Sequence, residues 1–194
     1  LTMNHKLVLA TESQYKKNIL KRLQIEFLSD APEIDEAPLQ GESAKALTER
    51  LARTKAAVVA LRHPDKIVIS TDQSASIFDD ILEKPKEETK ALAVLDTLSG
   101  QQVSFFTTVG FSAPGQPVKL HTEEVVVTFR QLEETEILRY VARDRPLDCA
   151  GSFKVEGIGI GLFNAVESRD PTALEGLPLI RLCQWLRDHG FKIP

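Results

Sequence analysis

The stretch KIVIST, residues 66–71, is the clearest strand signal in this chain, and the rest of the fold is organised around it. Its β-branched residues predict a central β-strand. Asp72 follows directly, so we expect a carboxylate just past the end of that strand. Because α/β sheets bind ligands outside the carboxyl ends of their strands, Asp72 is a candidate site residue.

Helix and strand patterns alternate on both sides of this strand. Upstream, an apolar run at residues 6–10 predicts a buried strand, followed by a helix that Thr11 or Ser13 could cap. A second helix is predicted from Ser43 to about Leu61. Downstream, the pattern predicts a helix at 86–99, a hairpin of strands at 103–111 and 118–129, a short helix at 133–141 and a closing helix after Pro178. The predicted class is α/β with mixed strand pairing.

Three glycines near the C-terminal third alternate with apolar residues. Gly157, Gly159 and Gly161 predict a strand with one bare face, against which a helix or a ligand packs closely. The spacing does not match the GxGxxG fingerprint, because Leu162 stands where the third glycine belongs. The segment therefore gives no sign of a dinucleotide-binding turn.

Composition limits the classes of function. The 194 residues predict a single domain, residues 1–194, built as one unit or as two small lobes sharing a sheet. The 24 basic and 28 acidic residues give a net charge of −4, which offers no general attraction to nucleic acid or an anionic membrane. No apolar run reaches the length of a membrane span, and the two cysteines do not form a disulfide scaffold. We expect a soluble, cytosolic protein that binds neither nucleic acid nor membrane.

Several lysines are candidates for an anion site. Ser13, Lys16 and Lys17 stand where the first strand meets the first helix, and a helix N-terminus attracts anions; a solvated basic face is the alternative. Lys55 falls on the apolar stripe of the second helix, so it either snorkels outward or meets a buried anion. Lys84 precedes a proline that holds the local backbone rigid, although an exposed loop lysine has the same pattern.

Carboxylates complete the candidate chemistry. Asp72 can act as a general base for water, as a metal ligand or as both, or it can cap the next turn. Glu36 in an acidic loop offers a second carboxylate, and two carboxylates with several lysines suit Mg²⁺ held against a polyphosphate. Glu156 can accept hydrogen bonds from the edge of a base, and Tyr15 offers a stacking surface.

Taken in order, these segments resemble the Maf family of nucleotide pyrophosphatases. The matching segments are LVLATES (7–13), APEIDE (31–36), LARTKA (51–56), STDQ (70–73), EKP (83–85), CAGSFKVEG (149–157), SRDP (168–171) and GLPL (176–179). CAGSFKVEG resembles the subgroup that acts on 7-methyl-GTP rather than the subgroup that acts on dTTP and UTP. The resemblance implies a Maf/ITPase-like fold, in which an elongated mixed β-sheet flanked by helices forms two lobes around a deep cleft.

The resemblance also implies a reaction and roles. The reaction is hydrolysis between the α- and β-phosphates of a nucleoside triphosphate, with Mg²⁺ or Mn²⁺ as the cofactor. Asp72 matches the proton acceptor, and with Glu36 it would hold the metal. The residues matching base-selecting positions are Tyr15, Gln73 and Glu156. The residues matching the phosphate and metal side of the cleft are Ser13, Glu36, Lys55 and Lys84.

The opening motif departs from the family pattern. The family has Ser-Pro, a variable residue and two arginines, whereas this chain has Ser13, Gln14, Tyr15, Lys16 and Lys17. Lysine keeps the positive charge but lacks the planar fork that binds phosphate bidentately, which predicts reduced activity or an altered substrate preference. The alternative function is a catalytically weakened nucleotide-binding regulator of cell division and septum formation. The predicted partner is a small-molecule nucleotide, and the sequence leaves a homodimer open.

Overall fold

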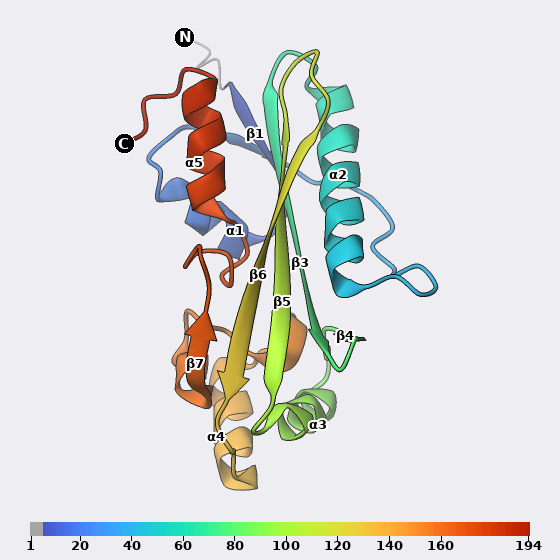
Figure 1. Ribbon diagram of the computed structural model, residues 1–194, viewed down its shortest axis with the longest axis vertical. Coiled ribbons are helices and arrows are strands. Elements are labelled where there is room, and N and C mark those ends of the chain that lie inside the picture. The colour runs from blue at the N-terminus through green and yellow to red at the C-terminus, as the bar shows by residue number, and fades with distance from the viewer. Residues whose placement is uncertain (1–5) are drawn as a thin grey trace.

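The computed structural model describes residues 6–194 as an elongated mixed sheet flanked by helices (Figure 1). The strand order is β2 (Leu28–Asp30), β1 (Leu7–Ala10), β3 (Ile67–Ile77), β5 (Gln102–Ser112), β6 (Lys119–Phe129) and β7 (Phe163–Glu167), with β4 (Asp80–Leu82) paired to β3 off this path. β1 runs parallel to β2 and β3, and the other pairs are antiparallel. The α/β class with mixed pairing and the long hairpin are confirmed.

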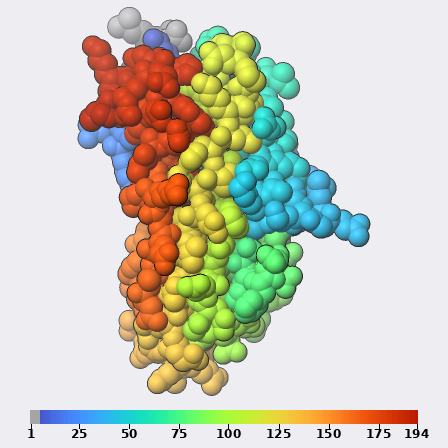
Figure 2. Space-filling view, in the orientation of Figure 1, coloured from blue at the N-terminus to red at the C-terminus, as the bar shows by residue number. Residues whose placement is uncertain are grey.

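Helices cover both faces of this sheet. They are α1 (Gln14–Lys21), α2 (Ala44–Arg62), α3 (Glu88–Leu98), α4 (Glu134–Asp144) and α5 (Leu179–Asp188). α2 lies along one side of the central strands, α1 and α5 lie on the other side near the termini, and α3 and α4 lie at the far end (Figure 1). In the space-filling view, α5 and α2 flank the tip of the β5–β6 hairpin (Figure 2). Within residues 6–194, no helix is long and apolar enough to cross a membrane.

Local signals place two of these helices correctly. The Ser13 hydroxyl caps α1 by accepting from the backbone N–H of Lys16, and the Ser43 hydroxyl caps α2 by accepting from that of Ala46. Such caps satisfy amide groups that the first helical turn leaves without an intrahelical partner. The predicted N-caps are confirmed.

One face of the central strands carries two apolar clusters separated by polar residues. Towards the termini, Ile67 and Ile69 of β3 pack with α1 and α5. Towards the other end, Ala75 and Ile77 of β3 pack with α3 and α4. Between the clusters the same face carries the residues we call the polar belt: Thr71 and Gln73 of β3, and Thr107 of β5, which lies directly opposite Gln73.

The central strand is longer than predicted. β3 continues to Ile77, so Asp72 lies inside the strand and not just past its end, and that part of the prediction is wrong. The reason is pairing with β5, which extends along β3 from Val68 to Ser76. The ladder hydrogen bonds hold residues 72–76 extended, although none of these residues is β-branched, the composition that marks a strand in sequence.

The strand predicted over the alternating glycines is wrong. Residues Ile158–Leu162 form a short 3₁₀ helix, and the strand β7 begins only at Phe163. A Cβ on Gly159 would collide with the carbonyl oxygen of Lys154 and would lie 2.9 Å from the Tyr140 hydroxyl. The close packing that the glycines indicated is therefore present, but it joins a tight turn to α4 and not a bare strand face to a helix or a ligand.

Candidate active site

A gap in the pairing of β3 creates the candidate site. β1 pairs with β3 only as far as Ser70, and β4 begins to pair at Ala75, so the edge between them is open at residues 71–74. A cavity of about 820 Å³ opens there. Because successive side chains point to opposite faces, Asp72 lies on the face covered by α2, and Gln73 lies on the opposite face with the rest of the polar belt. The cavity therefore meets both faces of one strand.

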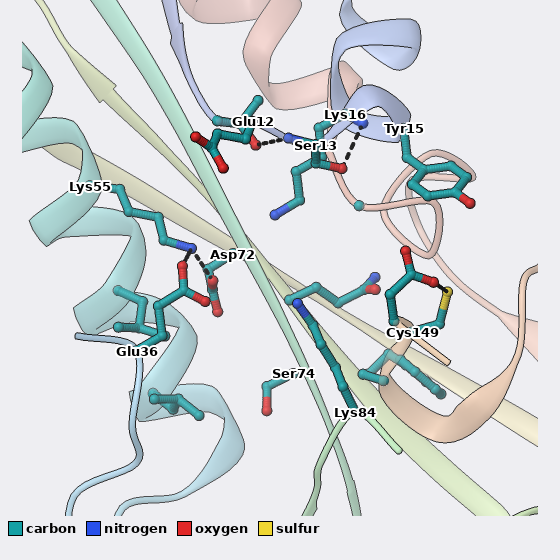
Figure 3. A pocket seen from close by; sticks show the side chains of 18 of the residues that line it. Glu12, Ser13, Tyr15, Lys16, Glu36, Lys55, Asp72, Ser74, Lys84 and Cys149 are labelled. Atoms are coloured by element: carbon teal, nitrogen blue, oxygen red, sulfur yellow. Dashed lines mark hydrogen bonds and ion pairs between the residues drawn. The ribbon is translucent and has the colours of Figure 1, made fainter. Parts of the chain in front are cut away.

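Lys55 of α2 links two carboxylates inside this cavity. Its Nζ lies 2.8 Å from Asp72 Oδ1 and 2.6 Å from Glu36 Oε1 (Figure 3). The Lys55 side chain is only 7 % exposed, so it meets a buried anion and does not snorkel to solvent. Burial lowers the pKa of Lys55, but the charge and hydrogen bond of Asp72, together with Glu36, outweigh burial and raise that pKa above its ordinary value.

Glu36 reaches the site from the loop between β2 and α2, and its side chain is about half exposed. Burial raises the pKa of this carboxyl, but the hydrogen bond from Lys55 and the nearby charges of Lys84 and Lys16 outweigh burial and lower it. Glu36 and Asp72 therefore converge as carboxylate groups on one point. Among residues 6–194, no group of three or more acidic, histidine or cysteine side chains could hold a metal. The carboxylates that meet at Lys55 are the pair Glu36 and Asp72.

Lys16 enters the cavity from the first turn of α1. Its Nζ donates a hydrogen bond to the carbonyl oxygen of Thr71, at the open edge of β3, at 3.1 Å. Burial lowers the pKa of Lys16 to about 8; Asp72 opposes this shift, and the like charges of Lys55 and Lys84 add to it. The charged form of Lys16 is therefore disfavoured in the folded protein, and an anion bound at this edge of β3 would stabilise it.

The other predicted phosphate-binding residues do not all reach the site. Ser13 and Lys84 line the cavity, Ser13 as the α1 cap and Lys84 from the loop after β4 (Figure 3). Lys17 does not line it. One residue further along a helix turns a side chain by about 100°, so Lys16 and Lys17 cannot both face the cavity. The structure separates Lys17 from the cluster of lysines and carboxylates.

The three predicted base-selecting residues, Tyr15, Gln73 and Glu156, all line the cavity. Tyr15 is 41 % exposed, and Lys154 Nζ lies 5.7 Å from the centre of its ring. Burial lowers the pKa of Lys154, but interaction with the neighbouring Tyr15 hydroxyl outweighs burial and raises it. Sequence reasoning missed Lys154, although it stands two residues before Glu156 in the same motif.

Cys149 also lines the cavity, beside Asp148 (Figure 3). Burial and the neighbouring Asp148 raise the pKa of this thiol to about 12. Because the thiolate is the reactive form of cysteine, Cys149 is inert as a nucleophile at neutral pH. Carboxylates and ammonium groups are left as the chemistry of the cavity.

Comparison with known proteins covers almost the whole chain. Residues 6–189 match the family model for Maf-like proteins. The chain belongs to the Maf family. It is 47% identical over 193 residues to the 7-methyl-GTP pyrophosphatase of Xanthomonas oryzae pv. oryzae, which covers 99% of this chain and 100% of that protein. It is 43% identical over 189 residues to the 7-methyl-GTP pyrophosphatase of Pseudomonas aeruginosa, covering 97% of this chain and 98% of that protein.

The Staphylococcus aureus Ham1 protein resembles this Maf chain in fold, with a TM-score of 0.55 at 15% identity over 95% of this chain and 99% of that chain. This likeness confirms the fold class. Every motif from LVLATES to CAGSFKVEG contributes a residue to the cavity, although the motifs are spread over residues 7–157. These six motifs therefore form the walls of one cavity; GLPL adds Gly176 to it, and SRDP does not line it.

Proposed function

We propose that this Maf protein hydrolyses the bond between the α- and β-phosphates in 7-methyl-GTP, or in a related modified nucleotide, to give the monophosphate and pyrophosphate. The observation that carries the proposal is the junction of Lys55 with Asp72 and Glu36 at the open edge of β3. The names of the Xanthomonas and Pseudomonas relatives support the substrate class.

The phosphate chain would lie along the lysines. Lys16, Lys55 and Lys84 supply positive charge on three sides of the cavity, and Ser13 marks the N-terminus of α1, where the helix dipole favours an anion. Negative charge grows on the leaving pyrophosphate as the anhydride bond breaks. Fixed cations aimed at that charge stabilise the transition state more than the ground state.

Asp72 would act as the general base. Lys55 binds its Oδ1, and no other hydrogen bond from residues 6–194 reaches this carboxylate, so Oδ2 is available to a water molecule. In the reaction, Asp72 takes a proton from the water while the water oxygen forms a bond to phosphorus. The bond from that phosphorus, the α-phosphorus, to the bridging oxygen breaks, and the leaving pyrophosphate takes the electron pair.

The two carboxylates fit a divalent cation. Mg²⁺ is bound through one or two carboxylates and completes its shell with phosphate oxygens and water, and Glu36 and Asp72 already converge on one cationic group. These two residues would hold Mg²⁺ or Mn²⁺. When bound, the ion neutralises charge on the phosphates.

The base would lie on the other side of the strand edge, between Tyr15, Gln73 and Glu156. A methylated guanine carries a positive charge, and stacking on the exposed part of the Tyr15 ring would contribute about 0.5–2 kcal/mol as a cation–π contact. Glu156 would accept hydrogen bonds from the N1–H and amino groups of guanine, which pyrimidines do not present in this arrangement. These contacts select a purine over UTP.

The test is release of pyrophosphate with Mg²⁺ or Mn²⁺ across a panel of triphosphates. Asp72→Asn should lower kcat by about a thousandfold, the scale of a lost general base, with an unchanged circular dichroism spectrum. Asp148→Asn is the matched control, because Asp148 lines the same cavity without contacting Lys55, and should stay within about threefold of wild type. Tight nucleotide binding without release would favour the regulator instead, and near-normal turnover in Asp72→Asn would remove the base assignment.

A further inference from the structure

The amide of Gln73 is held in one orientation by three acceptors. Its Nε2 lies 2.9 Å from Thr107 Oγ1, 3.0 Å from the Leu174 carbonyl oxygen and 3.1 Å from the Ala173 carbonyl oxygen. A backbone carbonyl can only accept a hydrogen bond. The amide nitrogen, and not the amide oxygen, must therefore face these groups, whichever way the side chain was first placed.

The amide oxygen of Gln73 is left for the cavity. Within residues 6–194, no group donates a hydrogen bond to Oε1, and Oε1 is not one of the buried polar atoms that lack a partner. Gln73 lines the cavity, so Oε1 is accessible there. A ligand approaching this wall meets a hydrogen-bond acceptor.

Thr107 determines that the amide nitrogen of Gln73, and not the amide oxygen, points towards β5. It lies directly opposite Gln73 on β5 and is completely buried. Its hydroxyl donates its single proton to the Ala173 carbonyl oxygen at 2.8 Å, so towards Gln73 it can only accept. On the neighbouring strand, Thr71 Oγ1 donates to the Gly176 carbonyl oxygen at 2.7 Å. Two belt threonines thus hold residues 173–176 against the sheet, with their carbonyls in place around the amide.

Packing does not explain why residue 107 in the polar belt is a threonine. The residues on the same face of β5 on either side of Thr107 are Val103, Phe105, Val109 and Phe111, all buried and apolar. A valine in place of Thr107 would join the two apolar clusters without loss of volume. The hydroxyl is instead used to fix a loop and a cavity-lining amide.

We propose that Thr107 is a positioning residue of the nucleotide site, which holds Gln73 so that its oxygen accepts from an N–H group of the base. The proposal rests on the proposed function and deepens it. A base that presents an amino group towards Gln73, as guanine can, gains a hydrogen bond, whereas uracil has no amino group to present. A base that presents a carbonyl oxygen there meets a second acceptor and is rejected.

Two substitutions at Thr107 separate the hydroxyl from its packing. Thr107→Val keeps the shape and removes the hydroxyl, whereas Thr107→Ser keeps the hydroxyl. For Thr107→Val we expect the ratio of kcat/KM for 7-methyl-GTP over UTP to fall about fivefold, the scale of one weakened hydrogen bond. The fall should come from weaker binding of the methylated substrate, seen as a higher KM, with little change in kcat. Thr107→Ser should stay near wild type. An unchanged ratio in Thr107→Val, or an equal fall in both variants, would overturn the proposal.

Gln73→Met shows whether Thr107 acts through Gln73. Methionine has a similar length and no amide, so Gln73→Met alone should lower the same ratio, and adding Thr107→Val should lower it no further. A full additional fall in the double variant would overturn the proposal. If Thr107→Val does not fold, Gln73→Met carries the test by itself, and an unchanged ratio in it has the same meaning.

Product binding keeps this test separate from turnover. Calorimetry gives the affinities for the two monophosphates, 7-methyl-GMP and UMP, in wild type and each variant, and the ratio of these affinities should fall in Thr107→Val as the kinetic ratio does. If wild type releases no pyrophosphate, the hydrolase proposal fails alone and the affinity ratio decides the role of Thr107. Equal affinity of wild type for both monophosphates, or no binding of either, would overturn the positioning role.

Discussion

Replacing Lys16 with methionine should make the folded protein more stable at neutral pH. Burial lowers the pKa of Lys16 from 10.5 to about 8, and each unit of pKa corresponds to about 1.4 kcal/mol, so the charged ammonium costs the fold about 3 kcal/mol. Methionine removes the charge and keeps the length. It also removes the hydrogen bond to the Thr71 carbonyl, a loss of about 1 kcal/mol. The net expectation at pH 7 is a gain of about 2 kcal/mol in the free energy of unfolding.

The pH dependence of this gain identifies its origin. The unfolded chain keeps the Lys16 proton up to about pH 10.5, whereas the folded protein keeps it only up to about pH 8. Between these values the unfolded state binds more protons, so the Lys16 contribution to wild-type stability improves as the pH rises. Lys16→Met has no such contribution. Its advantage over wild type should therefore disappear by about pH 10 in urea unfolding measured from pH 7 to pH 10.

Lys17→Met is the matched control, because Lys17 is the neighbouring lysine and does not line the cavity. It should change the free energy of unfolding by less than about 0.5 kcal/mol at either pH. The reasoning is refuted if Lys16→Met is no more stable than wild type at pH 7. It is refuted equally by a gain that persists unchanged to pH 10, since a packing effect would behave in that way.

Three further substitutions test other parts of the site and the fold. In wild type, kcat/KM should fall above about pH 8 as Lys16 loses its proton and its charge; Lys16→Arg keeps the charge, so its pH profile should stay flat to about pH 10. Glu156→Ala should lower the ratio of kcat/KM for 7-methyl-GTP over UTP about tenfold, and an unchanged ratio would remove Glu156 from the base site. Gly110→Ala should destabilise the protein by about 2 kcal/mol in urea unfolding, because its Cβ would collide with Ser70 Oγ and break the hydrogen bond from Ser70 to the Ala52 carbonyl; unchanged stability would show that β5 can move away from α2.

Local pattern determined most of the secondary structure. The Ser43 cap and the apolar stripe after it predicted α2 almost to the residue, and strict alternation over residues 103–111 predicted β5. These signals depend on residues within one or two turns of each other, or two apart on a strand, so sequence alone contains them. The same holds for Lys55, which falls on an apolar helical stripe, and for Asp72, which follows a strong strand segment. Glu36 was predicted as a second carboxylate because it lies in an acidic loop.

Tertiary structure decided which of these groups meet. The α2 stripe left open whether Lys55 turned to solvent or to an anion, and the answer came from Asp72 and Glu36, which lie on other elements. The length of β3 came from its pairing with β5, because polar residues are held extended by a neighbouring ladder and not by their own propensity.

Thr107 illustrates what local sequence periodicity predicts and what only long-range packing decides. Its sequence position places it on an apolar face of β5, but its hydrogen bonds run to Gln73 and to the Ala173 carbonyl, 34 and 66 residues away. The helix periodicity of about 3.6 and the strand periodicity of about 2 determine which face a residue occupies. They do not determine which residues contact that face, because those contacts depend on how distant segments of the chain pack in the folded protein.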